Sequence, residues 1–158
     1  MKPNKISLGK MRRLLWLMGV VKIPLIAYVR PKLMHLDEKS CKVRIKLRRR
    51  TKNHLKSMYF GSLAVGADVA AGLHAYYFAE NSGVKVSFAF KAVKAEFLMR
   101  AMTHVTFESK DGAIVEEAFQ EAMETKERVN QWVKVEAKNT ENEVVALFDM
   151  EISVKVKS

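Results

Sequence analysis

Residues 53–78 read NHLKSMYFGSLAVGADVAAGLHAYYF, and the run predicts one long apolar helix. Glycine, alanine and serine cover most of the circumference of that helix. Such a helix has low intrinsic stability, because each glycine costs about 1 kcal/mol relative to alanine. It is therefore expected to be stabilised by burial, with other backbone packed closely against its small side chains. A central helix wrapped by a sheet fits this pattern.

Asp68 lies in the middle of this segment and is the only acidic residue between Lys39 and Tyr77. A buried, unpaired charge costs several kcal/mol, so a carboxylate at this position needs a reason. Two interpretations stay open. Asp68 takes part in chemistry, or it is a structural carboxylate that accepts hydrogen bonds from Tyr59, Asn53 or buried backbone. Asp68 and the many small residues also argue against a membrane span.

Composition indicates one soluble globular domain. The chain has 158 residues, of which 49% are hydrophobic and 28% are charged, and both fractions are ordinary for such proteins. Its single cysteine, Cys41, excludes an internal disulfide and favours a reducing, cytoplasmic location. Cys41 falls on the apolar side of a strand pattern, so we expect it to be a core residue.

Positive charge is concentrated at the beginning of the chain. Residues 1–52 hold 16 Lys and Arg against two acidic residues, whereas the rest of the chain is slightly acidic. Such a region attracts polyanions, and a nucleotide-bearing ligand or a membrane surface is favoured over nucleic acid. The basic stretch lacks the interleaved aromatics of a single-strand binder, and it has no helix-turn-helix or zinc-finger spacing. A solvated basic surface without a partner is the alternative.

Residues 9–29 begin with a basic cluster and then become apolar. Lys22 and Pro24 interrupt the run, which stays shorter than the roughly 20 residues of a membrane span, and no cleavage site of a signal peptide follows. We predict a helix over about residues 7–21 that ends before Pro24. It packs on the fold, or it lies on a membrane with Trp16 and the Arg12/Arg13 pair at the interface.

Alternating and helical patterns predict the other elements. Residues 41–49 alternate as a strand with an entirely basic outer face, and residues 86–99 change parity near 91–92, which indicates a β-bulge. A short strand over 103–109 precedes a helical stripe over 113–126. Two strands, over 129–137 and 144–154, form a hairpin. Five antiparallel strands around one buried helix give an α+β architecture.

The start of the apolar helix resembles a family pattern. Asn53 is followed six residues later by Tyr59-Phe60-Gly61, and Asp68 comes further along. In the PaaI-type acyl-CoA thioesterases of the hotdog fold, an Asn precedes a His-Gly-Gly at the helix start, and an Asp or Glu follows. The resemblance covers about residues 40–156. It is strongest to an uncharacterised branch that has the run RTKNH and a Tyr-Phe-Gly helix start, as here at residues 50–54 and 59–61.

A later segment, EFLMRA at residues 96–101, is similar to the family's segment around Arg-Pro-Ala. The resemblance implies a hotdog fold, in which a curved antiparallel sheet of about five strands wraps round the long helix. The whole chain, 1–158, would form a single domain. Residues 1–40 would be an N-terminal helical extension, and residues 41–158 the hotdog core.

The resemblance also implies roles for individual residues. Asp68 would act as general base on water or as nucleophile on a thioester carbonyl, and Asn53 would position water or substrate. The backbone N–H of Gly61, at the helix start, would polarise the carbonyl. The sequence departs from the pattern where Tyr59 replaces the His and Phe60 replaces the first Gly.

Tyr59, Phe60 and His54 are expected in the substrate pocket by their place beside these residues. Purely structural roles stay open for Asn53 and His54. Asn53 is a common turn former and could simply shape the turn before the helix. His54 could be a loop histidine that is bonded to backbone. His35, His74 and His104 show no ligand spacing, so no metal site is expected.

The implied substrate is a coenzyme A thioester or another acyl thioester, with no resident cofactor. Lys91, Lys94 and Arg100 are candidates for binding the phosphates of coenzyme A, and residues 48–50 form an alternative patch. Hotdog domains pair their sheets, which implies a homodimer or a dimer of dimers with sites shared between chains.

Three functions stay open. The first is an acyl-CoA thioesterase. The second is a non-catalytic acyl- or lipid-binding hotdog protein, which the missing His-Gly-Gly favours. The third is a dehydratase or hydratase, which would require a His with an acidic partner in a motif that the sequence lacks.

Overall fold

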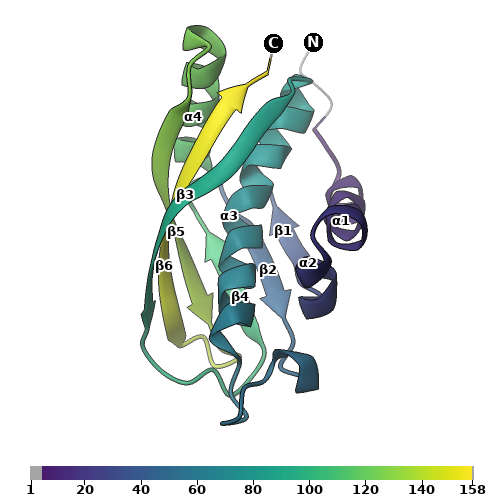
Figure 1. Ribbon diagram of the computed structural model, residues 1–158, viewed down its shortest axis with the longest axis vertical. Helices are drawn as coiled ribbons and strands as arrows, with labels where there is room; N and C mark the ends of the chain where they lie inside the picture. Colours follow the sequence, from purple (N-terminus) through teal and green to yellow (C-terminus); the bar gives the residue numbers. More distant parts are fainter. Residues whose placement is uncertain (1–4, 158) are drawn as a thin grey trace.

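A long helix packed in the concave face of an antiparallel sheet organises the molecule (Figure 1). The structure is a computed structural model that describes residues 5–157. The helix is α3, Phe60–Ser82. The six strands of the sheet have the order β1-β2-β4-β5-β6-β3. Their bounds are Lys32–Leu36, Cys41–Ile45, Val86–Phe97, Val105–Ser109, Val129–Lys138 and Val144–Val156 for β1 to β6. The α+β architecture is thus confirmed.

The N-terminal segment forms two helices beside α3. Helix α1, Leu8–Leu17, continues into a π-helical turn, Met18–Lys22, and ends before Pro24, in agreement with the predicted helix over 7–21. A second helix, α2, Pro24–Val29, was not predicted. Proline at its first position is favourable, because that residue needs no hydrogen-bonded N–H there. Among residues 5–157, no helix combines the length and hydropathy that crossing a bilayer requires.

The expected count of five strands is too low by one, because β1 was missed. The strand belongs to the segment predicted as a purely helical extension, and it pairs with β2 at the edge of the sheet. Its register shifts between Leu33 and His35. That irregularity removes the strict alternation by which a strand of five residues is recognised in a sequence.

The central helix begins later than residue 53. Residues 53–59 form a loop that is closed by a bridge between Lys52 and Met58. Within it, the Asn53 side chain accepts hydrogen bonds from the N–H groups of Leu55 and Ser57, and Lys56 adopts a positive φ of 61°. These local bonds compete with helix formation. At its other end, α3 runs to Ser82 and stops at Gly83, whose φ of 69° costs glycine less than any residue with a side chain.

The remaining boundaries differ by a few residues. The strand predicted over 41–49 ends at Ile45, and a short 3-10 helix, Arg49–Thr51, follows it. The strand predicted from residue 103 begins at Val105. Helix α4, Gly112–Thr125, and the β5–β6 hairpin lie where the patterns placed them. The register of β3 against β6 shifts between Phe90 and Ala92, which confirms the predicted bulge.

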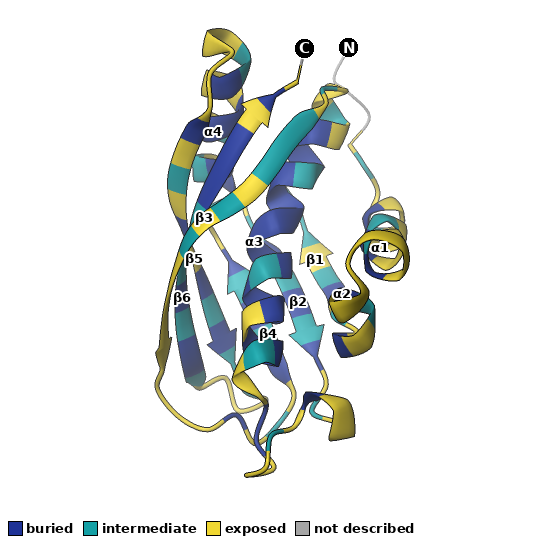
Figure 2. Ribbon diagram, viewed as in Figure 1, coloured by how far each residue is buried: buried dark blue, intermediate teal, exposed yellow. Residues whose placement is uncertain are grey.

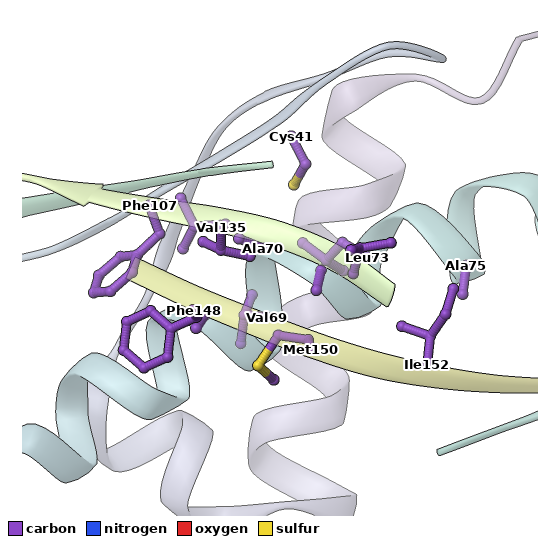
Figure 3. Close-up of a cluster of buried hydrophobic side chains, with 14 of the residues drawn as sticks. Cys41, Val69, Ala70, Leu73, Ala75, Phe107, Val135, Phe148, Met150 and Ile152 are labelled. Carbon is purple, nitrogen blue, oxygen red and sulfur yellow. The ribbon is translucent and has the colours of Figure 1, made fainter. Parts of the chain in front are cut away.

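The core lies between α3 and the sheet, with α4 closing one end. Figure 2 shows α3 buried along most of its length. Small side chains of the helix, such as Ala70, lie against larger ones from the strands, including Phe107, Phe148 and Ile152 (Figure 3). Cys41 is fully buried among them, as expected, and burial raises the pKa of its thiol.

Two glycines of α3 provide a matched test of this packing. A Cβ on Gly66 would lie 2.3 Å from the buried Phe107 ring, whereas on Gly72 it would lie 3.5 Å from Phe88. We expect Gly66→Ala to lower the free energy of unfolding by about 1–3 kcal/mol through overpacking. Gly72→Ala should be neutral, or stabilising by up to about 1 kcal/mol through helix propensity. Urea unfolding of both variants measures this, and equal effects would contradict the packing described.

Candidate active site

Asp68 lies on the one stripe of α3 between Phe60 and Glu80 whose residues are not fully buried. Between Phe60 and Glu80, the helix positions that are not fully buried are Gly61, Ala64, Asp68 and Tyr76. These residues recur about every fourth position, so they share one face of the helix. Asp68 opens there into a cavity of about 170 Å³. The sequence thus places its lone central carboxylate on the only accessible face of a buried helix.

The cavity beside Asp68 is apolar, and three parts of the chain line it. Helix α3 contributes Val69, Gly72, Leu73 and Tyr76 in addition to Asp68. Strand β3 contributes Phe88, Ala89 and Phe90. The remaining wall comes from the N-terminal helices, through Leu15, Met18, Ile23 and Ile26. Because Gly72 has no side chain, the space between the helix and the β3 aromatics stays open. The lining suits a hydrocarbon chain.

The carboxylate of Asp68 has no hydrogen-bond or ion-pair partner in the part of the chain that the structure describes. Burial raises its pKa to about 6, because desolvation disfavours the charged form. The hydrogen bonds from Tyr59, Asn53 or backbone that a structural role would require are not found among residues 5–157. An unpaired carboxyl with a raised pKa in a cavity is a typical feature of acid–base sites.

A second, shallower cavity joins Asp68 to the free edge of the sheet. It is lined by Ala64 and Asp68 of α3, by residues 90–93 of β3, and by Phe148 and Met150 of β6. Strand β3 is the last strand of the sheet, so its outer edge has no partner strand in the described chain. Val93 is 58% exposed and Phe97 is 52% exposed, which is high for apolar residues of a strand. The Asp68 site is therefore open towards an apolar sheet edge.

Gly61 lies at the exposed N-terminus of α3. Tyr59, the N-cap residue, makes no capping hydrogen bond with its side chain, and its ring lies against Gly61. Among the described residues, no acceptor is found for the backbone N–H of Gly61. A free N–H at a helix start can stabilise negative charge on a carbonyl oxygen.

Asn53, His54, Tyr59 and Phe60 do not line either Asp68 cavity. The carboxamide of Asn53 is engaged within its own loop, since its Nδ2 donates to Ser57 Oγ at 2.9 Å. His54 is exposed in the same loop. Tyr59 and Phe60 pack on each other with ring centroids 4.8 Å apart, and both remain about half exposed. Neither aromatic ring seals Asp68.

The three basic residues proposed for coenzyme A lie in different places. Lys91 lines the shallow cavity with Asp68. Lys94 points to the opposite face of the sheet, where its Nζ lies 4.8 Å from the centroid of the Trp132 ring. Arg100 is exposed next to Ala101, whose carbonyl accepts from the N–H of Met58, so it lies beside the loop that precedes α3. The structure brings only Lys91 to Asp68.

Sequence reasoning missed the part of the cavity wall that comes from α1 and α2. The apolar periodicity of residues 9–29 indicated that these residues pack on the fold, but not that they cover the cavity beside Asp68.

Within residues 5–157, no three His, Cys, Asp or Glu side chains are grouped in a way that could hold a metal ion.

Comparison with known protein families then places the chain. The sequence model of a family described as a domain of unknown function, DUF4442, matches residues 11–156. The chain belongs to the DUF4442 family. The match covers both the N-terminal helices and the sheet, so the cavity with its complete wall lies within the family domain. The curated proteins contain no match to this DUF4442 chain.

Several solved structures of similar shape are candidate or named thioesterases, and another is described as a protein of unknown function. A candidate thioesterase from Shewanella oneidensis has a TM-score of 0.80 at 12% identity, covering 95% of this chain and 100% of that one. A Pseudomonas aeruginosa protein of unknown function, described as a thioesterase candidate, has a TM-score of 0.76 at 18% identity, with 98% and 99% covered. A thioesterase from Haemophilus influenzae has a TM-score of 0.68 at 12% identity, with 99% and 96% covered. This DUF4442 chain has the hotdog fold, as the resemblance implied.

Proposed function

We propose that this protein hydrolyses an acyl thioester, with coenzyme A as the expected carrier and Asp68 as the general base. The observation that carries the proposal is the Asp68 carboxyl itself, which has no partner among residues 5–157 and has its pKa raised to about 6 by burial at an apolar cavity. A base with that pKa is ionised at neutral pH and still accepts a proton readily. Thioesters are activated enough for one carboxylate and one oxyanion donor to suffice.

The spacing along α3 limits how Asp68 acts. Asp68 lies seven residues beyond Gly61, which is about 10 Å along a helix. In direct attack, a carbonyl lies about 3 Å from its nucleophile and its oxygen about 3 Å from the donor. A carbonyl group in contact with both the Asp68 carboxylate and the Gly61 N–H would bridge less than the roughly 10 Å that separates these residues in one chain. We therefore favour Asp68 as a base that activates water over direct attack on a carbonyl held by its own Gly61.

A second copy of the chain would complete the site in another way. The unpaired edge of β3 is 12 residues long and carries exposed apolar side chains, and such an edge is a template for pairing with another strand. Pairing of two β3 edges would bring the second copy to the open side of Asp68, with its own Gly61, Tyr59 and Phe60. We propose a homodimer on this edge, and sedimentation velocity tests it: a monomer at micromolar concentration would contradict it.

Lys91, which lines the shallow cavity with Asp68, would bind a phosphate of coenzyme A. Arg100 lies away from that cavity, beside the loop that leads into α3, and would contact the coenzyme only at that end of the helix. Lys94 is not part of this proposal, because its ammonium group lies over Trp132 on the other face of the sheet. No resident cofactor is proposed. The lone cysteine, a buried free thiol, supports a reducing, cytoplasmic location.

Non-catalytic binding of acyl chains is the second candidate function. The apolar lining of the cavity and the aromatic residues at the position of the family's His-Gly support it. Acyl-CoAs of graded chain length distinguish the two functions when free thiol and ligand binding are measured in parallel. The proposal expects release of thiol for at least one chain length. Tight binding of an acyl-CoA without release of thiol would instead show that the protein is a non-catalytic binding protein.

A further inference from the structure

A second apolar surface lies on the N-terminal helices, and of its residues only Ile23 also lines the Asp68 cavity. Within residues 16–28, seven large apolar side chains are at least two-fifths exposed: Trp16, Leu17, Val20, Val21, Ile23, Leu25 and Tyr28. Val21 is 70% exposed and Trp16 is 63% exposed. We call these seven residues the apolar surface. Figure 2 shows exposed segments on the outer sides of α1 and α2. Apolar side chains that gather in this way on a water-soluble fold mark an interaction site.

These helices also hold an open groove. It has a volume of about 510 Å³ and lies between α1 and the segment that runs from α2 into β1. Its floor includes Leu15, Ile26 and Leu33, and Trp16 and Val20 of the apolar surface stand at its side. Arg12, Arg30 and Lys32 line it as well. The groove therefore combines an apolar interior with cations.

A basic concavity adjoins the groove. It measures about 200 Å³ and is lined by six cationic side chains and no acidic one: Arg30, Lys32, Arg44, Lys46, Arg48 and Arg50. None of the six forms an ion pair within residues 5–157. The Nε of Arg44 is buried without a hydrogen-bond partner among the described residues. Such unneutralised guanidinium groups are suited to phosphate, which they bind through two parallel hydrogen bonds.

The concavity and the apolar surface are physically joined. Arg30 and Lys32 line both the groove and the concavity. Arg50, inside the concavity, donates from Nη1 to the backbone carbonyl of Tyr28 and lies 5.1 Å from the centroid of the Tyr28 ring. One continuous face thus carries exposed indole and phenol rings, aliphatic side chains and a cluster of cations. Aromatic residues with arginine and lysine at the border are the composition of proteins that lie in a membrane interface.

We propose that this face docks on an anionic phospholipid membrane. The apolar surface enters the boundary between headgroups and acyl chains, and the basic concavity binds lipid phosphate. The charge excess of residues 1–52 supplies the attraction to an anionic leaflet, which acts over about one Debye length. The groove beside Trp16 and Arg30 offers space for one acyl chain. The proposal does not depend on Asp68 or on thioester hydrolysis.

Vesicle binding of the full chain tests the proposal. The probes are vesicles of phosphatidylcholine alone and of phosphatidylcholine mixed with phosphatidylserine, and the readout is co-sedimentation. We expect binding to the mixed vesicles only, weakened roughly tenfold or more by Val21→Asp and likewise by the Arg48→Glu/Arg50→Glu double variant. The Lys155→Glu/Lys157→Glu double variant reverses two exposed cations at the end of β6, so it matches the charge change of the arginine double variant and should bind like the wild type.

Fluorescence distinguishes insertion from surface attraction. The chain has two tryptophans, so Trp132→Phe leaves Trp16 as the only indole reporter. Vesicles with bromine-labelled acyl chains should quench Trp16 and shift its emission to the blue. Equal binding to both vesicle types would overturn the proposal, as would binding without quenching. Loss of self-association in Val21→Asp, without any vesicle binding by the wild type, would assign the surface to a contact between copies instead.

Discussion

Asp68→Asn is expected to lower kcat/KM for the preferred acyl thioester by about 10² to 10⁴, the contribution typical of a positioned general base. The amide has nearly the shape of the carboxyl, so the cavity keeps its form while the proton acceptor is lost. Binding of substrate should change little, because the cavity wall is apolar and is left intact. The measurement is initial thiol release at saturating and at limiting substrate.

Glu124→Gln is the matched control for this variant. Glu124 is an exposed residue of α4, and its replacement also removes one negative charge from the chain. Full activity in Glu124→Gln, with the large loss in Asp68→Asn, assigns the effect to position 68. If Asp68→Asn kept more than about a tenth of wild-type kcat/KM, general base catalysis by this carboxyl would be excluded.

The same substitution is expected to stabilise the fold at neutral pH. Burial raises the pKa of Asp68 from 3.8 to about 6, so between these values the folded state binds more protons than the unfolded state. The free energy of unfolding therefore falls as pH rises through that window, and the loss is complete above it. A shift of this size corresponds to about 2 to 3 kcal/mol. Asp68→Asn has no carboxyl to ionise at this position, so its free energy of unfolding does not show this fall with pH.

Urea unfolding of both proteins near pH 4 and near pH 8 measures the effect. We expect Asp68→Asn to exceed the wild type by about 2 to 3 kcal/mol at the higher pH, and the difference to shrink strongly at the lower pH. Comparison with the wild type removes the contributions of the other titrating groups. A difference that is independent of pH would show that Asp68 ionises in the fold as it does in the unfolded chain. A variant that gains stability and loses activity shows the trade-off that is expected at a catalytic site.

The main features of the fold could be predicted from local patterns. Small residues around Asp68 required a helix that is buried on several sides, and α3 is such a helix. The parity change at residues 91–92 indicated a bulge, and the register shifts there. Lys94 was a candidate by its position in the strand, but its side chain lies over Trp132, on the face of the sheet opposite to Val93. Patterns of this kind are reliable where burial imposes them, since a strand alternates only when one of its faces is covered.

The site itself depended on tertiary structure that no local pattern encodes. Leu15 and Ile26 line the Asp68 cavity, although they belong to a segment about 50 residues earlier in the sequence. Asn53 matched a family position, yet its side chain forms its hydrogen bonds within its own loop, to Leu55 and Ser57. Helix α2 and strand β1 escaped prediction because each spans only about six residues, too few to show a period. Asp68 was identified because a lone carboxylate on an apolar helix requires an explanation.

The pH dependence of kcat/KM tests the central role of Asp68 most directly. The profile is recorded from about pH 4.5 to about pH 8.5 on the best acyl-CoA substrate, with uncatalysed hydrolysis subtracted. If the Asp68 carboxylate is the base, kcat/KM rises about tenfold per pH unit at low pH and levels off above a midpoint near pH 6, the pKa that burial gives this carboxyl. A profile that is already level at pH values well below 6, or the same midpoint in Asp68→Asn, would contradict the account.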